Sequence, residues 1–184
     1  MDMKRLFDIF FSLAALTVFT LPMCVIAFLL RVVEHHPVFY RQERVGKNKK
    51  TFSILKFRTL ENGVPTPVGK YLRMTGIDEW AQFFNVLKND MSIVGPRALT
   101  PSDIERLKWN DEFHLVRWQL KPGISGLAQL YGGQHRKTSW FWDRYYSAHQ
   151  SLAMDFCIVT ASFAVNIFGK IRVRRMIFKN HKLK

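Results

Sequence analysis

Asp78 and Glu79 form an acidic pair inside the stretch 72–97, which reads LRMTGIDEWAQFFNVLKNDMSIVGPR. Arg73 precedes the pair, and Arg97 ends a Gly-Pro-Arg turn that follows it. Guanidinium groups bind phosphate through charge-assisted hydrogen bonds, and an ionised carboxylate that faces a bound phosphate can act as a nucleophile. These residue types therefore fit phosphoryl transfer with Asp78 as the attacking group.

The same stretch predicts a helix that would position the pair. Thr75 and Asp78 have the spacing of a capping box, in which the hydroxyl and the carboxylate each accept a backbone N–H of the first turn. The N-terminus of such a helix would favour the ionised carboxylate and offer free N–H groups to a phosphate. Capping alone explains these two residues, but it does not explain Arg73 and Arg97. Apolar side chains recur at the i, i+3, i+4 and i+7 spacing of one helix face: Trp80, Phe83, Phe84 and Leu87.

The composition limits what such a site could serve. A chain of 184 residues suits one domain with a real core. Its 28 Lys and Arg against 14 Asp and Glu give a net charge of +14, which indicates an anionic partner: nucleic acid, a phospholipid surface or a phosphorylated substrate. Cys24 and Cys157 stand in apolar runs without metal-ligand spacing, so we expect buried, reduced thiols and neither disulfides nor a zinc site.

An apolar run at residues 6–30 is long enough to cross a bilayer as a helix. It passes directly into Arg31 without the small-residue cleavage pattern of a signal peptide. Basic residues flank both of its ends, whereas a spanning helix should show a charge difference. Pro22 must disturb the helix, and the hydroxyl of Thr17 or Thr20 could bond a group that it frees. The residues alone leave a kinked spanning helix and a re-entrant hairpin equally open.

The next segment predicts a strand hairpin with a basic tip, formed by residues 37–42 and 51–58. Lys56 and Arg58 would share one face of the second strand, where they could bind phosphate or remain solvated. Residues 61–67, ENGVPTP, have the composition of a loop. Ser102 would cap a helix that continues to Trp118.

The last segment predicts attachment to a membrane surface. In residues 152–169, Phe156 and Phe163 fall on one side of a helix and Asp155 on another, as in a helix that lies in the headgroup region. Residues 170–184 contain seven Lys or Arg and no acid, and each would contribute about 1 kcal/mol of attraction to an anionic leaflet. A nucleic-acid-binding tail is the competing interpretation, but no nucleic-acid-binding motif accompanies it.

Taken together, these segments resemble the bacterial sugar transferases of the monotopic phosphoglycosyl transferase family. The resemblance covers nearly the whole chain, through the following motifs: KRLFDIFFSL, PVFYRQERVGKNKKTFSILKFRTL, VGKYLRMTGIDEWAQFFNVLKNDMSIVGPR, LKPGISGLAQLYG and WDRYYSAHQSLAMDFCIV. Several long motifs in the same order make it specific. Gly76-Ile77 stands where Ser-Leu is commoner, and Ala98 follows Arg97 where proline is expected.

The resemblance implies a two-step reaction. Asp78 would attack the β-phosphate of a UDP-sugar, release UMP and carry the phosphosugar until polyprenyl (undecaprenyl) phosphate removes it. Glu79 would assist as a base or orient the acceptor, and Mg²⁺ would bridge Asp78 and the diphosphate. Arg73 and Arg97 would bind phosphate. Lys56 and Arg58 also match family positions near the phosphates, with a less defined role.

The resemblance also implies an architecture, a mostly helical α/β monotopic membrane protein in the minimal catalytic form. Residues 1–33 would be a re-entrant hairpin broken at Thr20 and Pro22, residues 34–151 a cytoplasmic catalytic domain, and residues 152–184 an interfacial helix with a basic tail. The site would lie at the cytoplasmic face of the bacterial inner membrane, in contact with lipids and without nucleic acid. Which sugar is used, and whether identical chains assemble, stay open. The alternative function is a non-catalytic basic module that binds a membrane surface or nucleic acid.

Overall fold

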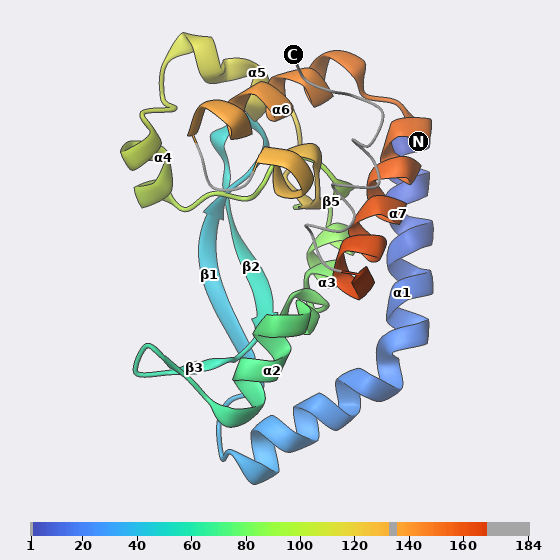
Figure 1. Ribbon diagram of the computed structural model, residues 1–184, viewed down its shortest axis with the longest axis vertical. Coiled ribbons are helices and arrows are strands. Elements are labelled where there is room, and N and C mark those ends of the chain that lie inside the picture. Colours follow the sequence, from blue (N-terminus) through green and yellow to red (C-terminus); the bar gives the residue numbers. More distant parts are fainter. Residues whose placement is uncertain (1, 133–135, 169–184) are drawn as a thin grey trace.

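The computed structural model describes residues 2–132 and 136–168. Over those residues the protein is mostly helical, as the sequence predicted, and it contains three small two-stranded sheets where the sequence predicted a single strand hairpin (Figure 1). The elements in chain order are α1 (Met3–Phe28), η1 (Leu29–Val33), β1 (Phe39–Val45), η2 (Lys47–Lys49), β2 (Thr51–Phe57), β3 (Leu60–Glu61), β4 (Val64–Pro65), α2 (Pro67–Thr75), η3 (Ile77–Glu79), α3 (Gln82–Leu87), β5 (Ser92–Val94), α4 (Pro101–Leu107), η4 (Glu112–His114), α5 (Leu115–Trp118), β6 (Gly123–Ser125), η5 (Ala128–Gly132), α6 (Arg136–His149) and α7 (Leu152–Phe168).

The N-terminal helix bends but does not break. It runs continuously through Pro22, and Figure 1 shows α1 turning sharply partway along its length. The hydroxyls of Thr17 and Thr20 donate to the carbonyls four residues before them, a contact that itself tends to bend a helix. Neither hydroxyl reaches the carbonyl that Pro22 leaves free, that of Val18, so this part of the prediction was wrong. The helix over Met3–Val33 is long and apolar enough to cross a membrane, judged by length and composition.

The start of α1 is fixed to the rest of the protein by a buried carboxylate. Asp8 is 2% exposed and accepts hydrogen bonds from the hydroxyl of Ser92 and the backbone N–H of Ile93, both at 2.9 Å. Because a buried acid without partners would be costly, these contacts fix the position of α1 against β5.

Two basic residues beside Asp8 also bind protein groups. The Lys4 amine lies 2.7 Å from the buried carboxylate of Asp155 on α7, which also accepts a hydrogen bond from the Tyr146 hydroxyl. Arg5 donates to the carbonyls of Val86 and Leu87 at the end of α3, where a cation also complements the helix dipole. The charges that the sequence suggested as a membrane flank therefore join α1, α3 and α7.

The predicted strand hairpin is confirmed. β1 and β2 pair antiparallel along their whole length, from Phe39 opposite Phe57 to Val45 opposite Thr51. Lysines occupy the tip, where Asn48 and Lys49 adopt left-handed backbone angles. The hairpin therefore has a basic tip, as expected.

Two predictions of local structure were wrong. The stretch after β2 is not a plain loop but a second small hairpin, β3–β4, which turns at Asn62 and Gly63 with positive φ. Asn-Gly is the usual sequence for such a turn. Thr100, not Ser102, caps α4, and this helix ends at Leu107 instead of continuing to Trp118.

The helix α7 turns its acid inward and large apolar groups outward. Asp155 is fully buried, whereas Phe156 is 58% and Phe163 64% exposed. This agrees with the predicted two-sided helix. Cys24 and Cys157 are free, as expected, but exposed rather than buried, because each stands on the outer side of its helix. The predicted basic tether at 170–184 lies outside the described residues.

Candidate active site

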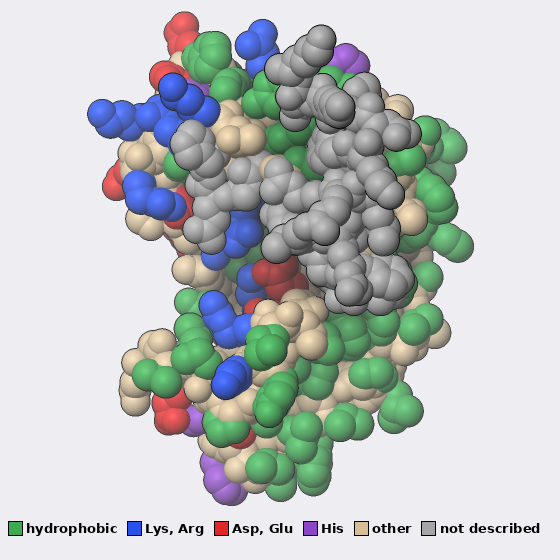
Figure 2. Space-filling view, in the orientation of Figure 1, with side chains coloured by type: hydrophobic (Ala, Val, Ile, Leu, Met, Phe, Trp, Pro, Cys, Tyr) green, Lys and Arg blue, Asp and Glu red, His purple; other side chains and the backbone are tan. Residues whose placement is uncertain are grey.

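One cavity of about 610 Å³ is lined by both acids and by all four basic residues that the sequence predicted as its partners. Figure 2 shows Lys and Arg side chains gathered in a hollow in the middle of this face, with hydrophobic side chains over α1. The six residues come from four separate stretches of chain: Lys56, Arg58, Arg73, Asp78, Glu79 and Arg97.

Asp78 sits on a short 3₁₀ turn between two helices. The helix α2 ends at Thr75, whose hydroxyl donates to carbonyls of its own helix, and Gly76 reverses the chain with φ 73°. The helix α3 begins only at Gln82. The predicted capping box between Thr75 and Asp78 was therefore wrong, because Thr75 is the last residue of α2 and its hydroxyl bonds within that helix.

Burial dominates the protonation of Asp78. The residue is only 8% exposed, and this desolvation raises the pKa of its carboxyl group. The Lys56 amine and the Arg73 guanidinium oppose the shift, while the charge of Glu79 adds to it. The expectation of a helix dipole favouring the charged form was wrong, because no α-helix starts at Asp78. A desolvated carboxylate is, however, a stronger nucleophile than a hydrated one when it is ionised.

The second acid already has a basic partner. Glu79 accepts a hydrogen bond of 2.5 Å from the Lys56 amine on β2. The two residues join the acidic turn to the strand hairpin. Since Lys56 also lowers the pKa of Asp78, one lysine serves both acids.

The predicted phosphate ligands border the cavity from different sides. Arg73 is exposed on the last turn of α2, with one nitrogen 3.4 Å from the Thr59 hydroxyl. Arg58 follows β2 immediately and shares its face with Lys56. Arg97 is exposed although its chain neighbours are buried. Each guanidinium can therefore meet an anion in the cavity.

The turn that carries Arg97 is closely packed. Gly95 and Gly123 leave no room for a side chain: a Cβ at Gly95 would lie 2.3 Å from the carbonyl of Lys121, and one at Gly123 only 2.1 Å from the Gly95 nitrogen. Glycine allows this close backbone approach. The parallel β5–β6 pair thus holds the Gly-Pro-Arg turn in place.

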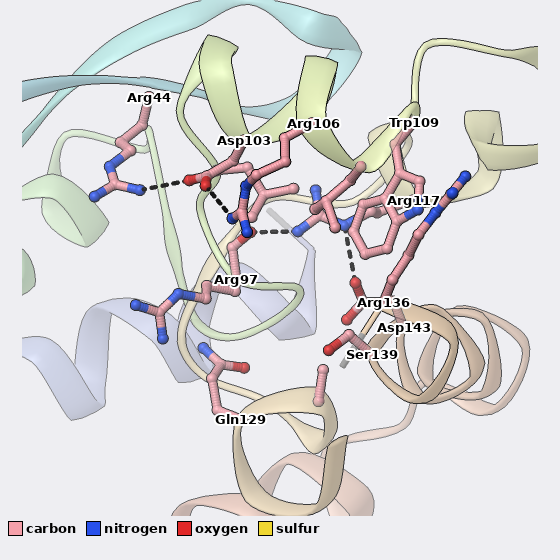
Figure 3. Close-up of a pocket in the computed structure, with 13 residues that line it drawn as sticks. Arg44, Arg97, Asp103, Arg106, Trp109, Arg117, Gln129, Arg136, Ser139 and Asp143 are labelled. Carbon is pink, nitrogen blue, oxygen red and sulfur yellow. Dashed lines mark hydrogen bonds and ion pairs between the residues drawn. The ribbon is translucent and has the colours of Figure 1, made fainter. Parts of the chain in front are cut away.

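A buried ion pair supports the same turn from behind. Arg117 donates to the backbone carbonyl of Arg97 and, through Nε at 2.8 Å, to the carboxylate of Asp143 on α6. Both Arg117 and Asp143 are 3% exposed. Burial raises the pKa of Asp143, and Arg117 counteracts the rise. Figure 3 shows the Arg97 side chain extending away from Arg117, so this pair positions the Arg97 backbone and leaves its guanidinium available.

Arg44 also lines the cavity, although the sequence did not predict it as a site residue. It lies on β1 with Tyr40 and Gln42, which line the same cavity at every second position. Its guanidinium donates to Gln42 and to the Ala98 carbonyl. Its place could have been inferred from the predicted hairpin. Tyr40 pairs directly with Lys56, and Arg44 shares the face of Tyr40 because residues two apart on a strand point the same way.

A known protein family matches most of the sequence. The bacterial sugar transferase family matches residues 1–169. The chain belongs to that family. The acidic turn, the strand hairpin and the Gly-Pro-Arg turn described above all lie within the residues that the family matches.

Three relatives illustrate the similarity. The chain is 35% identical to the UDP-N-acetylgalactosamine-undecaprenyl-phosphate N-acetylgalactosaminephosphotransferase of Aeromonas hydrophila, over 90% of this chain and 44% of that protein. It is 38% identical to the UDP-glucose:undecaprenyl-phosphate glucose-1-phosphate transferase of Klebsiella pneumoniae, over 72% and 31%. It is 33% identical to the exopolysaccharide production protein PSS of Rhizobium leguminosarum bv. phaseoli, over 85% and 91%. The chain thus spans less than half of the first two relatives.

The donor groups of the cavity fit a magnesium ion that is shared with a substrate. The described residues contain no group of three or more His, Cys, Asp or Glu side chains that could hold a metal alone. Mg²⁺ commonly binds one or two carboxylates and completes its octahedron with phosphate oxygens and waters. Asp78 offers one such carboxylate at the cavity wall, while Glu79 is engaged by Lys56.

Proposed function

We propose that this sugar transferase moves a sugar-1-phosphate from a UDP-sugar to polyprenyl phosphate, as the first membrane step in assembling a glycan. A carboxylate oxygen of Asp78 forms a bond to the β-phosphorus, and the bond from that phosphorus to the bridging oxygen breaks, so UMP leaves with the electron pair. An oxygen of polyprenyl phosphate then attacks the phosphosugar on Asp78. The products are polyprenyl diphosphate sugar and the free carboxylate.

The observation that carries this proposal is the content of the cavity. A buried carboxylate shares about 610 Å³ with five cationic side chains, which come from β1, the end of β2, α2 and the Gly-Pro-Arg turn. A diphosphate donor and a phosphate acceptor are both anions, so a carboxylate can attack only if positive charge offsets the repulsion and the charge of the transition state. The names of the relatives, which pair UDP-sugars with undecaprenyl phosphate, support the choice of substrates.

The side chains take distinct roles in this proposal. Asp78 is the nucleophile, and the Lys56–Glu79 pair keeps one amine beside it to favour its ionised form. Arg97 and Arg73 bind phosphate oxygens, assisted by Arg58. When the acceptor arrives, Glu79 orients its phosphate or accepts its proton.

Asp78 would also be the protein ligand of Mg²⁺. The bound ion would neutralise part of the diphosphate charge. Arg97 and Arg73, which both line the cavity, can provide the remaining positive charge.

We further propose that α1 enters and leaves the bacterial inner membrane by its cytoplasmic face, with the catalytic residues 34–151 beside it. The bend in α1 (Figure 1) and its large exposed apolar side chains support this arrangement. Tyr71 and Met74 are 69% and 73% exposed on either side of Arg73. Exposed apolar groups next to a phosphate ligand suit a lipid whose phosphate enters from the headgroup plane.

A donor-only experiment tests the chemistry directly. The full chain, purified in detergent with Mg²⁺, is incubated with a panel of UDP-hexoses and UDP-N-acetylhexosamines, and the intact mass of the protein is measured. We expect the mass of one phosphosugar to be added and UMP to be released. Labelled UMP should also exchange into the donor without any acceptor, since the first step is reversible. Asp78→Asn should abolish the adduct, the exchange and the lipid product.

The matched control is Asp2→Asn, because Asp2 is exposed and caps α1 and asparagine caps a helix equally well. Turnover without an adduct would indicate direct attack by the acceptor and overturn the covalent step. If no donor yields UMP while Asp78→Asn binds membranes or nucleic acid as the natural protein does, the non-catalytic module is correct.

A further inference from the structure

A second cavity, of about 480 Å³, adjoins the catalytic one. It is enclosed by α4, α5, η5 and α6 (Figure 3). Arg44 and Arg97 line both cavities. A smaller space of about 50 Å³ is lined by Lys56 and Glu79 of the catalytic cavity and also by Gln129 of the second. The two cavities are therefore neighbours that share Arg44 and Arg97 as lining residues.

The lining of the second cavity is basic. Five arginines face two aspartates there, an excess of three positive charges. A neutral sugar gains little from such an excess, whereas a nucleoside monophosphate carries negative charge that arginines bind well. The lining residues are Arg44, Arg97, Leu99, Asp103, Arg106, Leu107, Trp109, Arg117, Ala128, Gln129, Arg136, Ser139 and Asp143.

The second cavity also has features that suit a pyrimidine ring. Leu99, Leu107 and Trp109 give it apolar wall area. Trp109 is 2% exposed, and its indole N–H has no hydrogen-bond partner among the described residues. A small-molecule site typically combines such apolar walls with a few polar groups that fix orientation.

Reaction geometry places the leaving group on this side. In phosphoryl transfer the attacking and leaving oxygens lie roughly in line on opposite sides of the phosphorus. Of these two cavities, Asp78 borders only the catalytic one, whereas Arg97 borders both the catalytic and the second cavity. A phosphorus held between Asp78 and Arg97 therefore directs its leaving group past Arg97.

The lipid acceptor has a different route. The exposed apolar residues beside Arg73 lie on α2, and in Figure 1 α2 is at the opposite end of the β1–β2 hairpin from α4, α5 and α6. An acceptor that arrives from the α2 side leaves the second cavity to the donor.

We propose, on the basis of the proposed function, that the second cavity holds the UMP half of the donor, with its phosphate between Arg97 and Arg106. The sugar then stays in the catalytic cavity. The second cavity would thus set specificity for the nucleotide, and UMP would remain there after the first step as a competing product.

Two pairs of variants test this assignment. Ser139→Trp fills the second cavity, and Ala148→Trp places the same ring on an exposed part of α6. Arg106→Gln removes a charge from the wall, and Arg144→Gln removes one from an exposed position that lines neither cavity. The measurement is equilibrium binding of UMP, and separately of a hexose 1-phosphate, to the full chain in detergent.

We expect Ser139→Trp and Arg106→Gln to weaken UMP binding at least about tenfold, with hexose 1-phosphate binding unchanged and both controls like the natural protein. UMP binding that is unaffected by both variants, or a loss of hexose 1-phosphate binding instead, would overturn the assignment. Since Arg106 is largely exposed, Arg106→Gln decides the matter if Ser139→Trp does not fold. Failure of the proposed function looks different: the natural protein then forms no phosphosugar adduct with any donor.

Discussion

The buried pair Arg117 and Asp143 should couple the stability of the protein to the position of Arg97. Arg117→Met removes the cation and leaves the carboxylate of Asp143 and the Arg97 carbonyl without their partner. Removing one member of a buried ion pair typically costs about 3–5 kcal/mol. For a domain of this size that corresponds to a decrease in Tm of roughly 6–20 °C, measurable by intrinsic fluorescence in detergent.

The loss should depend on pH with a definite sign. Burial already raises the pKa of Asp143, and Arg117 holds that rise in check. Without Arg117 the folded-state pKa rises further, so the ionised carboxyl destabilises the fold and the penalty grows as pH rises through that pKa. Arg117→Met should therefore recover much of its Tm at acidic pH, where Asp143 is protonated.

A double variant separates stability from positioning. In Arg117→Met combined with Asp143→Leu no buried charge remains, and such replacements are often neutral or stabilising by about 1–4 kcal/mol. We expect Tm to return while kcat/KM stays low, because the Arg97 backbone still lacks its hydrogen bond. Recovery of both quantities, or a loss below about 1 kcal/mol in Arg117→Met, would refute this reasoning.

Three further predictions concern the cavity around Asp78 and the turn beside it. Asp78→Asn should raise Tm at neutral pH, because the raised pKa of the Asp78 carboxyl means that its ionised form costs folding free energy. The Tm values of the variant and the natural protein should converge below the ordinary carboxyl pKa of about 4. Lys56→Met should move the acid limb of the kcat/KM profile to higher pH, since Lys56 lowers the pKa of Asp78, whereas exposed Lys88→Met leaves the limb in place. Gly123→Ala should cost about 1–3 kcal/mol or more in denaturant unfolding and reduce activity, because its Cβ would meet backbone at 2.1 Å.

Much of the fold could be predicted because its signals are local. Alternating apolar and polar residues and a glycine-containing tip predicted the β1–β2 hairpin. The length and hydropathy of the first apolar run predicted α1. The bounds of the helix around the acids could not be predicted, because Thr75 has the chemistry of a cap for a helix that opens at Asp78 but is the last residue of α2. Tertiary packing decided between two locally reasonable helices.

The site residues that carry charge in short motifs were predicted and meet in one cavity. Arg44 and Arg117 were missed because their roles depend on contacts across the fold: one reaches Ala98 and the other the Arg97 carbonyl. The raised pKa of Asp78 could not be predicted from the sequence either, because it comes from burial in the packed chain and not from the neighbouring residues in the sequence.

The ion pair between Lys4 and Asp155 has a consequence for how the protein is made. During synthesis Lys4 leaves the ribosome before the residues that line the cavity around Asp78, and Asp155 leaves it only after them. The amphiphilic first helix can therefore reach a bilayer long before its amine finds the carboxylate that neutralises it. The buried contact that joins α1 to α7 can therefore close only after the whole chain between these two helices has been made.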